Sequence, residues 1–499
     1  MKISYIKSFA LAGIMLFSAS ACKKVLEPEL TYAIEASRLK TIIDFERVLN
    51  GGYAFMRNDG YYRFGYTGGG DVGTDNMIET TASLGNNRSL AQWFYNSGSA
   101  GVSRLWSSPY QVINQANAVL DNIDNLVETA PGQKNRIRGQ AIALRALAHF
   151  DLMRFFAVEY DRNSPALGVA IKTKSEATFP PRSTVKECYD FIYKDLTEAE
   201  ELLGDVDVAV NGIRKTRLDI HGVRALRARV SLYAKEWADA KDYADKVIAG
   251  SGINLGSISG SIGVGLTASA INNTTSFQSV WFNDLNSGVE TIFAVAFNVG
   301  QGAPGNFPND GVNAFTVSSD WRGLFTGTPT NDVRFNVTYN GAASPAAASY
   351  QKFSGRFNGT SIARDGNVDV KVFRIAEMYL IRAEANFNLG NNTDARSDIR
   401  TLRLNRINAY DPLTDNVADI LANIQLERRK ELVGEGHRWF DAKRYNLSFD
   451  RGAAPGQGDC PSTAPDCSIQ AGDYRFVYPI PLGEIQANPA MKSQQNPGW

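Results

Sequence analysis

The sequence predicts a mostly α-helical protein, built as an array of helix pairs that is interrupted by an irregular, loop-rich region. Over most of the chain, apolar residues recur at the three- and four-residue spacings of amphipathic helices. Residues 251–350 depart from this pattern because they are rich in Gly, Ser, Asn and Ala. At 499 residues the chain is long for one compact core, which favours a repeated architecture.

The overall charge argues against a nucleic-acid partner. The chain has 52 basic and 52 acidic residues, so its formal net charge is zero, whereas nucleic-acid binders normally carry a basic excess or a basic stripe. Aromatic residues make up 11% of the chain, and many lie in polar, Gly/Asn-rich segments. Such aromatics either form binding platforms or hold loops onto the core.

Residues 1–21 are typical of an export signal of the lipoprotein type. Two lysines precede an apolar run over residues 9–17, which is too short to span a bilayer. The following Ala-Ser-Ala-Cys resembles the lipobox of bacterial lipoproteins, with Ala19 where Leu is usual. We expect cleavage before Cys22 and lipidation of its thiol, with no other membrane anchor in the chain. The alternative is an ordinary cleaved signal with an incidental cysteine.

The other three cysteines have simpler expected roles. Cys188 lies in a helical pattern and is expected to be a small buried residue. Cys460 and Cys467 bracket the loop DCPSTAPDC, and in an exported protein they are expected to form a local disulfide worth roughly 2.5 kcal/mol. Metal binding by this pair is the weaker alternative, because none of the three histidines is near it in sequence.

Helices are expected in order along the N-terminal half. Residues 105–126 carry one apolar stripe, and Ala-Pro-Gly at 130–132 separates them from a second, alanine-rich helix over 136–160. Thr184 and Glu187 have the spacing of a capping box and start a third.

Residues 220–250 are expected to form two helices joined around Ala234-Lys235-Glu236. The second of them spaces Trp237, Ala240, Ala244 and Ile248 like the second helix of a tetratricopeptide unit. No strict 34-residue repeat is visible, so we expect a degenerate tetratricopeptide-like array, whose stacked pairs leave an extended surface for binding.

Beyond residue 250, Thr291 to Phe297 is a strand candidate within the loop region. Helix is expected to resume over 368–390, with Val372 on its apolar stripe, and again over 421–444. In the latter block the charged run of residues 427–431 suits intrahelical ion pairs, each worth about 0.2–0.5 kcal/mol.

An ordered series of fragments resembles the SusD/RagB family of nutrient-binding outer-membrane lipoproteins. Each fragment is weak alone, and their order along nearly the whole mature chain carries the resemblance. The fragments are Cys22 followed by KKVLE, LNGGYAFMR, LWSSPYQVINQANAVL, GQAIALRALAHFDLMRFFA, STVKECYDFIYKDLTEAEELL, ETIFAVAF, FRIAEMYLIRAEANFNLG, ERRKELVGEGHRWFDAKR and the closing YPIPLGEIQANPAMKSQQNPGW.

The resemblance implies a SusD-like fold with an N-terminal region over 22–250 and a C-terminal region over 251–499 that together form one compact unit. It also implies a cell-surface protein that binds glycans, or in some members other polymers such as peptides. Such proteins cap a SusC-like TonB-dependent transporter and deliver ligand into it. They do no covalent chemistry on the ligand and need no cofactor.

The residues themselves give no sign of catalysis. The three histidines fall within or beside helical patterns and form no metal-ligand spacing, so we expect no metal site. The run GSISGSIGVG lacks a phosphate-loop sequence, and nothing selects a pair of carboxylates for glycoside cleavage.

The best candidates for ligand contact are aromatics outside the regular helices, together with polar neighbours. An aromatic face suits the apolar face of a sugar ring, and adjacent amides or charged groups suit its hydroxyls. The predicted ligand residues are Trp93, Tyr95, Trp281, Asn283, Trp321, Arg322 and Tyr62. Trp106 and Trp237 lie within helical stripes and are assigned to the core.

Two other functions stay open at this point. The first is a helical scaffold that binds only the transporter, which a flat titration with oligosaccharides would favour. The second is a surface glycosidase, which new reducing ends in the same panel would favour.

Overall fold

The computed structural model describes residues 39–80, 83–204, 215–258, 275–298, 301, 314–339, 350–353, 355–356 and 366–499. The leader, Cys22 and much of the loop-rich region lie outside these described residues.

The described residues form a helix-rich fold with three small sheets, as expected from the sequence. The helices are α3 (Ile42–Phe55), α4 (Arg88–Ala91), α5 (Ala100–Asn122), α6 (Gln133–Phe156), α7 (Val185–Leu203), α8 (Ile220–Tyr233), α9 (Trp237–Gly250), α10 (Ser276–Phe282), α11 (Ser319–Gly323), α12 (Val333–Thr338), α13 (Ile375–Asn388), α14 (Asn392–Leu404), α15 (Ile420–Glu431), α16 (Arg438–Tyr445) and α17 (Leu482–Ala487). Short 3₁₀ turns are η2 (Ile123–Asn125), η5 (Asp284–Asn286), η6 (Pro329–Asn331), η7 (Tyr474–Phe476) and η8 (Pro489–Met491).

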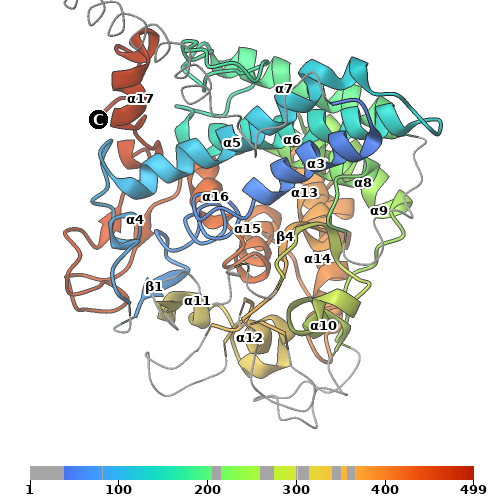
Figure 1. Ribbon diagram of the computed structural model, residues 1–499. Coiled ribbons are helices and arrows are strands. Elements are labelled where there is room, and N and C mark those ends of the chain that lie inside the picture. Colours follow the sequence, from blue (N-terminus) through green and yellow to red (C-terminus); the bar gives the residue numbers. More distant parts are fainter. Residues whose placement is uncertain are drawn as a thin grey trace, which may run out of the picture.

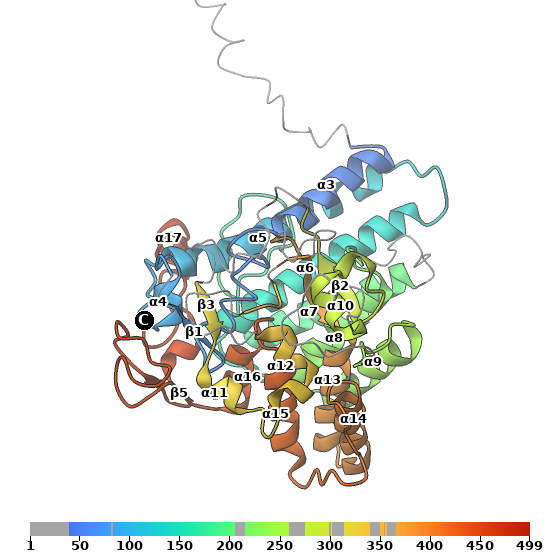
Figure 2. The same ribbon diagram turned by 90° about the horizontal axis from the view of Figure 1, so that it is seen from below.

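The long helices pack side by side in a continuous series. Helix α6 packs against α5 and α7, α8 against α7 and α9, and α13 against α9 and α14. Figure 2 shows α3 and α5 across the molecule from α14 and α15, whereas in Figure 1 α15 lies near the middle of the view, below α5. The capping box predicted at Thr184 and Glu187 is present at the start of α7, so the expected helix boundary is confirmed.

Each sheet joins two short antiparallel strands. They are β1 (Met77–Glu79) with β3 (Phe315–Val317), β2 (Thr291–Val295) with β4 (Val370–Arg374), and β5 (Phe449–Asp450) with β6 (Ser468–Ile469). The first two pairings bring early or middle segments against later ones, whereas β5 and β6 pair locally within the C-terminal region. The strand expected from Thr291 is confirmed as β2.

Two expected helices have other boundaries than their sequence patterns predict. Residues 370–374 form strand β4, so Val372 lies in a strand and the helix begins only at Ile375. The period of a short apolar run does not separate strand from helix, and pairing with β2 decides it.

The block over 421–444 is also divided, into α15 and α16. Gly434 and Gly436 between them have φ of 75° and 81°, and a Cβ at Gly436 would stand 1.7 Å from the carbonyl oxygen of Tyr66.

The charged run of α15 makes tertiary ion pairs, so the expectation of intrahelical pairs is wrong. Glu427, Arg428 and Glu431 are almost fully buried. Burying a charged group is costly unless it is paired, and each of these groups has a partner on another element. The partners are Arg334 and Arg403 for Glu427, Asp441 for Arg428, Asp75 and Asp320 for Arg429, and Arg374 and Arg406 for Glu431.

Glu431 lies at the centre of this network. Its Oε1 accepts hydrogen bonds from Arg374 at 2.9 Å and Arg406 at 3.0 Å, and its Oε2 accepts a second bond from Arg406 at 2.9 Å. Both arginines also bind Glu290, and Arg374 binds Glu435 at 2.7 Å. Burial opposes ionisation of Glu431, but Arg406 and Arg374 hold its pKa well below the ordinary value.

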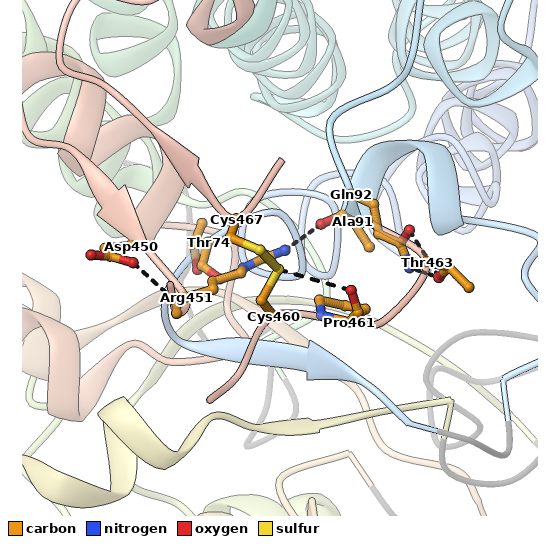
Figure 3. The surroundings of a disulfide bond; sticks show 10 residues. Thr74, Ala91, Gln92, Asp450, Arg451, Cys460, Pro461, Thr463 and Cys467 are labelled. Carbon is orange, nitrogen blue, oxygen red and sulfur yellow. Dashed lines mark hydrogen bonds between the residues drawn. A yellow bond between two sulfur atoms is a disulfide. The ribbon is translucent and has the colours of Figure 1, made fainter. Parts of the chain in front are cut away.

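Cys460 and Cys467 are joined by a disulfide, with their Cα atoms 5.3 Å apart (Figure 3). Beside it, the buried Arg451 donates to the backbone carbonyls of Thr74 and Ala91, which ties this C-terminal loop to the early loops. Cys188 is buried in α7, as expected.

We expect Glu431→Gln to lower the free energy of unfolding by roughly 3–5 kcal/mol. The substitution keeps the shape of the side chain but leaves two buried guanidinium groups with one shared anion, Glu290, instead of two. Urea denaturation of the purified protein measures the loss. The matched control is Glu201→Gln on the exposed face of α7, which should change stability by less than about 0.5 kcal/mol. Equal stability of the two variants would contradict a central role for Glu431.

Candidate ligand-binding cavity

A cavity of about 480 Å³ opens between α5, the segment 170–180 and the C-terminal residues of α17 and η8. This volume falls within the range of small-molecule sites, about 300–1,000 Å³. Most of its walls come from three parts of the sequence that only the fold brings together, and Trp106 and Glu484 in these walls are 378 residues apart.

The floor of the cavity is aromatic. Trp106 and Tyr110 occupy positions i and i+4 of α5, and their ring centroids are 5.1 Å apart. Tyr110 donates its hydroxyl to the carbonyl of Ala170 at 2.8 Å, and burial raises its pKa well above the ordinary value. Trp106 donates its Nε1–H to Glu484 Oε2 at 3.3 Å. Both rings are therefore fixed in place by bonds to the opposite walls.

A proline inside α5 is accommodated next to this floor. Pro109 has no N–H to offer the carbonyl of Leu105 one turn earlier. The hydroxyl of Tyr66 donates to that carbonyl at 3.3 Å. The early loop thus replaces the missing helix hydrogen bond, and α5 stays helical through the site.

Polar side chains of α5 line the cavity beside the rings. Ser107, Gln111 and Asn114 follow one another at helical spacing and are exposed. Gln111 accepts a hydrogen bond from Asn58. Among the described residues, the side-chain amides of Asn114 and Gln115 make no hydrogen bond to protein, so both can donate to and accept from a ligand.

The segment 170–180 is held to α5 by side chains that bind its backbone. Asn117 donates to the carbonyls of Lys172 at 3.0 Å and Lys174 at 3.2 Å. The carboxylate of Asp121 accepts from the N–H and the hydroxyl of Ser175, each at 2.9 Å. These bonds fix a loop that contains no regular structure, so the wall is preformed.

His149 adds one more bond to this wall from helix α6. Its Nε2 accepts the backbone N–H of Lys172 at 3.2 Å, and its Nδ1 lies 2.9 Å from the carbonyl of Arg145. The neutral ring with the proton on Nδ1 satisfies both contacts. Burial lowers the pKa of His149 to about 3, which keeps the ring neutral.

The third wall is the end of the chain. Asn488 donates to the carbonyl of Pro180 at 2.9 Å and lies beside Glu484. Phe179, next to Pro180 in this wall, leaves 56% of its side chain exposed. The cavity therefore offers an accessible ring, a fixed aromatic floor, unused amides and one carboxylate. That combination suits a ligand with apolar faces and many hydroxyl groups.

The predicted ligand residues lie elsewhere, and most of them are buried. Trp93 has a positive φ of 61°, donates its Nε1–H to Gly73 at 2.7 Å, and lies under the guanidinium of Arg451. Tyr95 packs against Tyr478 with a centroid distance of 4.4 Å. Both residues are 2% exposed, so neither ring has a free face for a sugar.

Trp321 and Tyr62 are also enclosed. Trp321 is fully buried, donates its Nε1–H to the carbonyl of Arg429 at 3.1 Å, and packs against Phe325. Tyr62 donates to the buried carboxylate of Asp151 at 2.8 Å.

Arg322, next to Trp321, is partly exposed and reaches the hydroxyl of Tyr339 at 3.3 Å. Trp281 is fully buried beneath Lys352, 4.8 Å from its ring, whereas the nearby Asn283 is exposed. Of the seven predicted residues, Asn283 and Arg322 are the accessible ones, so ligand contact stays a prediction for these two.

Sequence reasoning did not select the residues of the cavity. Trp106 was assigned to the core from its stripe, and it is buried, yet its ring also forms the cavity floor. Asn114 carried one usable signal, since it lies on the polar side of an otherwise apolar helix next to two aromatics. Phe179 and Glu484 carried none, because only the fold brings them to α5.

Two further features bear on what the site can do. Within the described ranges, no three His, Cys, Asp or Glu side chains gather so as to ligate a metal ion. Among the described helices, none has the length and apolar character needed to cross a membrane.

Known proteins resemble the chain along nearly its whole length. Residues 33–232 match a SusD-like family described as starch-binding and associating with the outer membrane, and residues 328–499 match the SusD family. SusD-like protein P38 of Formosa agariphila is 24% identical over 504 residues, covering 89% of this chain and 92% of that protein.

Solved structures agree with these matches. A SusD superfamily protein from Bacteroides thetaiotaomicron has 26% identity and a TM-score of 0.74, covering 92% of this chain and 100% of that one. A SusD-like carbohydrate binding protein from Bacteroides vulgatus has 27% identity and a TM-score of 0.73, covering 91% of this chain and 97% of the other.

We expect His149 to make stability fall as the pH drops below about 6.5. The ring has a pKa of about 3 in the folded chain and about 6.5 when unfolded, so the unfolded state binds the extra proton between these values. The contribution is complete above pH 6.5 and amounts to a loss of about 2 kcal/mol by pH 5. Urea denaturation at a series of pH values measures the slope. His149→Gln keeps a donor and an acceptor but does not titrate, so an unchanged slope in that variant would refute the assignment.

Proposed function

The chain belongs to the SusD family of carbohydrate-binding proteins, and from this premise we propose that it captures glycans in the α5 cavity and delivers them to a SusC-like transporter. The observation that carries the proposal is that the unused amides of Asn114 and Gln115 line the same cavity as the exposed ring of Phe179. A pyranose presents an apolar face and a rim of hydroxyls, and this arrangement has a partner for each.

The cavity supports binding without covalent chemistry. Glycoside hydrolysis uses two carboxyl groups that flank the scissile bond. Of the two carboxylates on the cavity wall, Glu484 accepts bonds from Trp106 and Asn488, and Glu176 is exposed at the rim. We therefore assign the cavity to capture, in line with a family of binding proteins.

Delivery to a transporter and attachment to the membrane are further parts of the proposal. The family description associates these proteins with the outer membrane. We assign the anchor to lipid on Cys22 and place the protein on the outside of the cell, tethered by the residues that precede α3. Capture at the membrane then raises the local concentration of ligand for a partner that imports it.

We expect Asn114→Ala and Phe179→Ala each to weaken glycan binding by about tenfold. The first removes a hydrogen-bonding amide and the second an exposed ring, and losses near 1.4 kcal/mol correspond to that factor. Isothermal titration of the mature protein with a panel of neutral oligosaccharides, including maltohexaose, measures the change. The control Asn392→Ala, at an exposed position of α14, should bind like the parent protein.

The same oligosaccharide panel decides between the cavity and the accessible predicted residues, Asn283 and Arg322. Asn283→Ala and Arg322→Ala are the suitable variants, since replacing the buried tryptophans would destabilise the protein by several kcal/mol. Loss of binding in these two variants, with Asn114→Ala unaffected, would assign the site to Asn283 and Arg322. Flat titrations of the parent protein would instead favour a scaffold that binds only the transporter.

We expect Cys22→Ala to release the protein from the membrane fraction. Without the thiol of Cys22 no lipid can be attached, and the polypeptide around this position does not hold a protein on a bilayer by itself. Cell fractionation and immunoblotting measure the distribution, with Cys188→Ala as the matched control that should stay membrane-bound. A Cys22→Ala protein found wholly in the membrane fraction would contradict the anchor.

A further inference from the structure

We propose that the α5 cavity selects neutral glycans over glycans that carry carboxylates, and that Glu484 causes the selection. The inference rests on the proposed function and names the ligand class within it. It follows from the position of Glu484, from the partners of the other charged groups in the wall, and from the reach of the polar side chains of α5 that line the cavity.

Glu484 presents a carboxylate to the cavity, where Lys172 interacts with it electrostatically without approaching to ion-pair distance. Its Oε2 accepts from Trp106 Nε1 at 3.3 Å and its Oε1 from Asn488 Nδ2 at 3.3 Å, and both donors are neutral. Among the described residues, no Lys or Arg forms an ion pair with it. Each oxygen keeps a further lone pair, so the group can accept hydroxyl protons from a ligand.

The two lysines of the wall are already engaged. The ammonium of Lys172 donates to the carbonyls of Glu176 and Thr178 and to the hydroxyl of Thr178, which uses all three of its protons. Lys174 lies 2.9 Å from the carboxylate of Asp121.

With Glu176 exposed at the rim, the acidic groups at this wall outnumber the basic ones. The lining itself carries two lysines, Lys172 and Lys174, and two glutamates, Glu176 and Glu484. Asp121 lies outside the lining and pairs with Lys174, and counting it gives the acidic excess.

These charges treat the two ligand classes differently. A neutral sugar donates its hydroxyls to Glu484, and hydrogen bonds to a charged acceptor are roughly twice as strong as neutral ones. A uronate places a second negative charge next to the first in a half-buried site, where repulsion is only partly screened. At the position next to Glu484, a ligand hydroxyl therefore strengthens binding and a ligand carboxylate weakens it.

The polar side chains of α5 that line the cavity extend far enough to contact more than one sugar ring. Ser107 and Asn114 are seven residues apart on α5, a distance of about 10 Å along the axis. That is longer than a single pyranose, so adjacent rings of a chain can meet successive polar side chains. We infer a short neutral oligosaccharide as the ligand.

The test compares chains of the same backbone that differ at C6, where the oxidised chain has a carboxylate in place of the hydroxymethyl group. Maltohexaose, cellohexaose and laminarihexaose are each paired with the same chain oxidised at C6 to the carboxylate, and all six are titrated into the mature protein. We expect the neutral member of the bound pair to bind at least about tenfold more tightly. Raising the salt concentration should narrow that ratio, because added ions screen the repulsion.

Glu484→Gln should reduce the preference to about threefold or less, whereas Glu201→Gln, which makes the same charge change outside the cavity wall, should leave it unchanged. The salt dependence of the parent protein tests the inference even if Glu484→Gln proves unstable. An oxidised chain that binds as tightly as its neutral partner would overturn the inference while the proposed function stands. An unaltered preference in folded Glu484→Gln would remove Glu484 as its cause. No binding of any of the six chains would refute the proposed function itself.

Discussion

The shared ion pairing of Glu431 is the constraint on which the rest of the architecture depends. Through Arg374 and Arg406 this one carboxylate joins strand β4, the end of α14 and the end of α15, and through Glu290 it reaches the start of β2. Buried charges of this kind contribute little net stability when satisfied, but they are costly to break. They therefore specify one arrangement of elements. The ion pairs of Glu431 connect the irregular middle of the chain to the helical array. They also hold in place the segments from which the neighbouring loops begin.

The candidate site obeys a similar rule on a smaller scale. A segment without regular structure forms a wall because Asn117, Asp121 and His149 bind its backbone from two helices. Side chains supply the hydrogen bonds that a strand or helix would have supplied to itself. The groups left over, above all the amide of Asn114, are then available to a ligand. Binding capacity at this cavity is what remains after the loop has been secured.

The sequence predicted the helical elements well and the site poorly, for one physical reason. Helix periodicity and the Thr184 capping box are local, so residues a few positions apart suffice to recognise them. The β4 strand, the ion pairs of Glu427 and the burial of Trp321 depend on partners tens to hundreds of residues away. Aromatics in Gly- and Asn-rich stretches were expected either to bind ligand or to hold loops onto the core, and the local sequence does not decide between the two. Here the loops fold over them, and the accessible ring of Phe179 gave no sequence signal.

The closing wall of the cavity also has a consequence for proteolysis. Asn488 bonds to Pro180, the backbone carbonyl of Gln494 accepts the guanidinium of Arg182, and Asn496 donates to Phe156. Residues 488–496 thus complete a surface whose other parts lie more than 300 residues earlier in the sequence. Cleavage before Asn488 would remove this side of the cavity, so ligand capture depends on the integrity of a short segment without long helices.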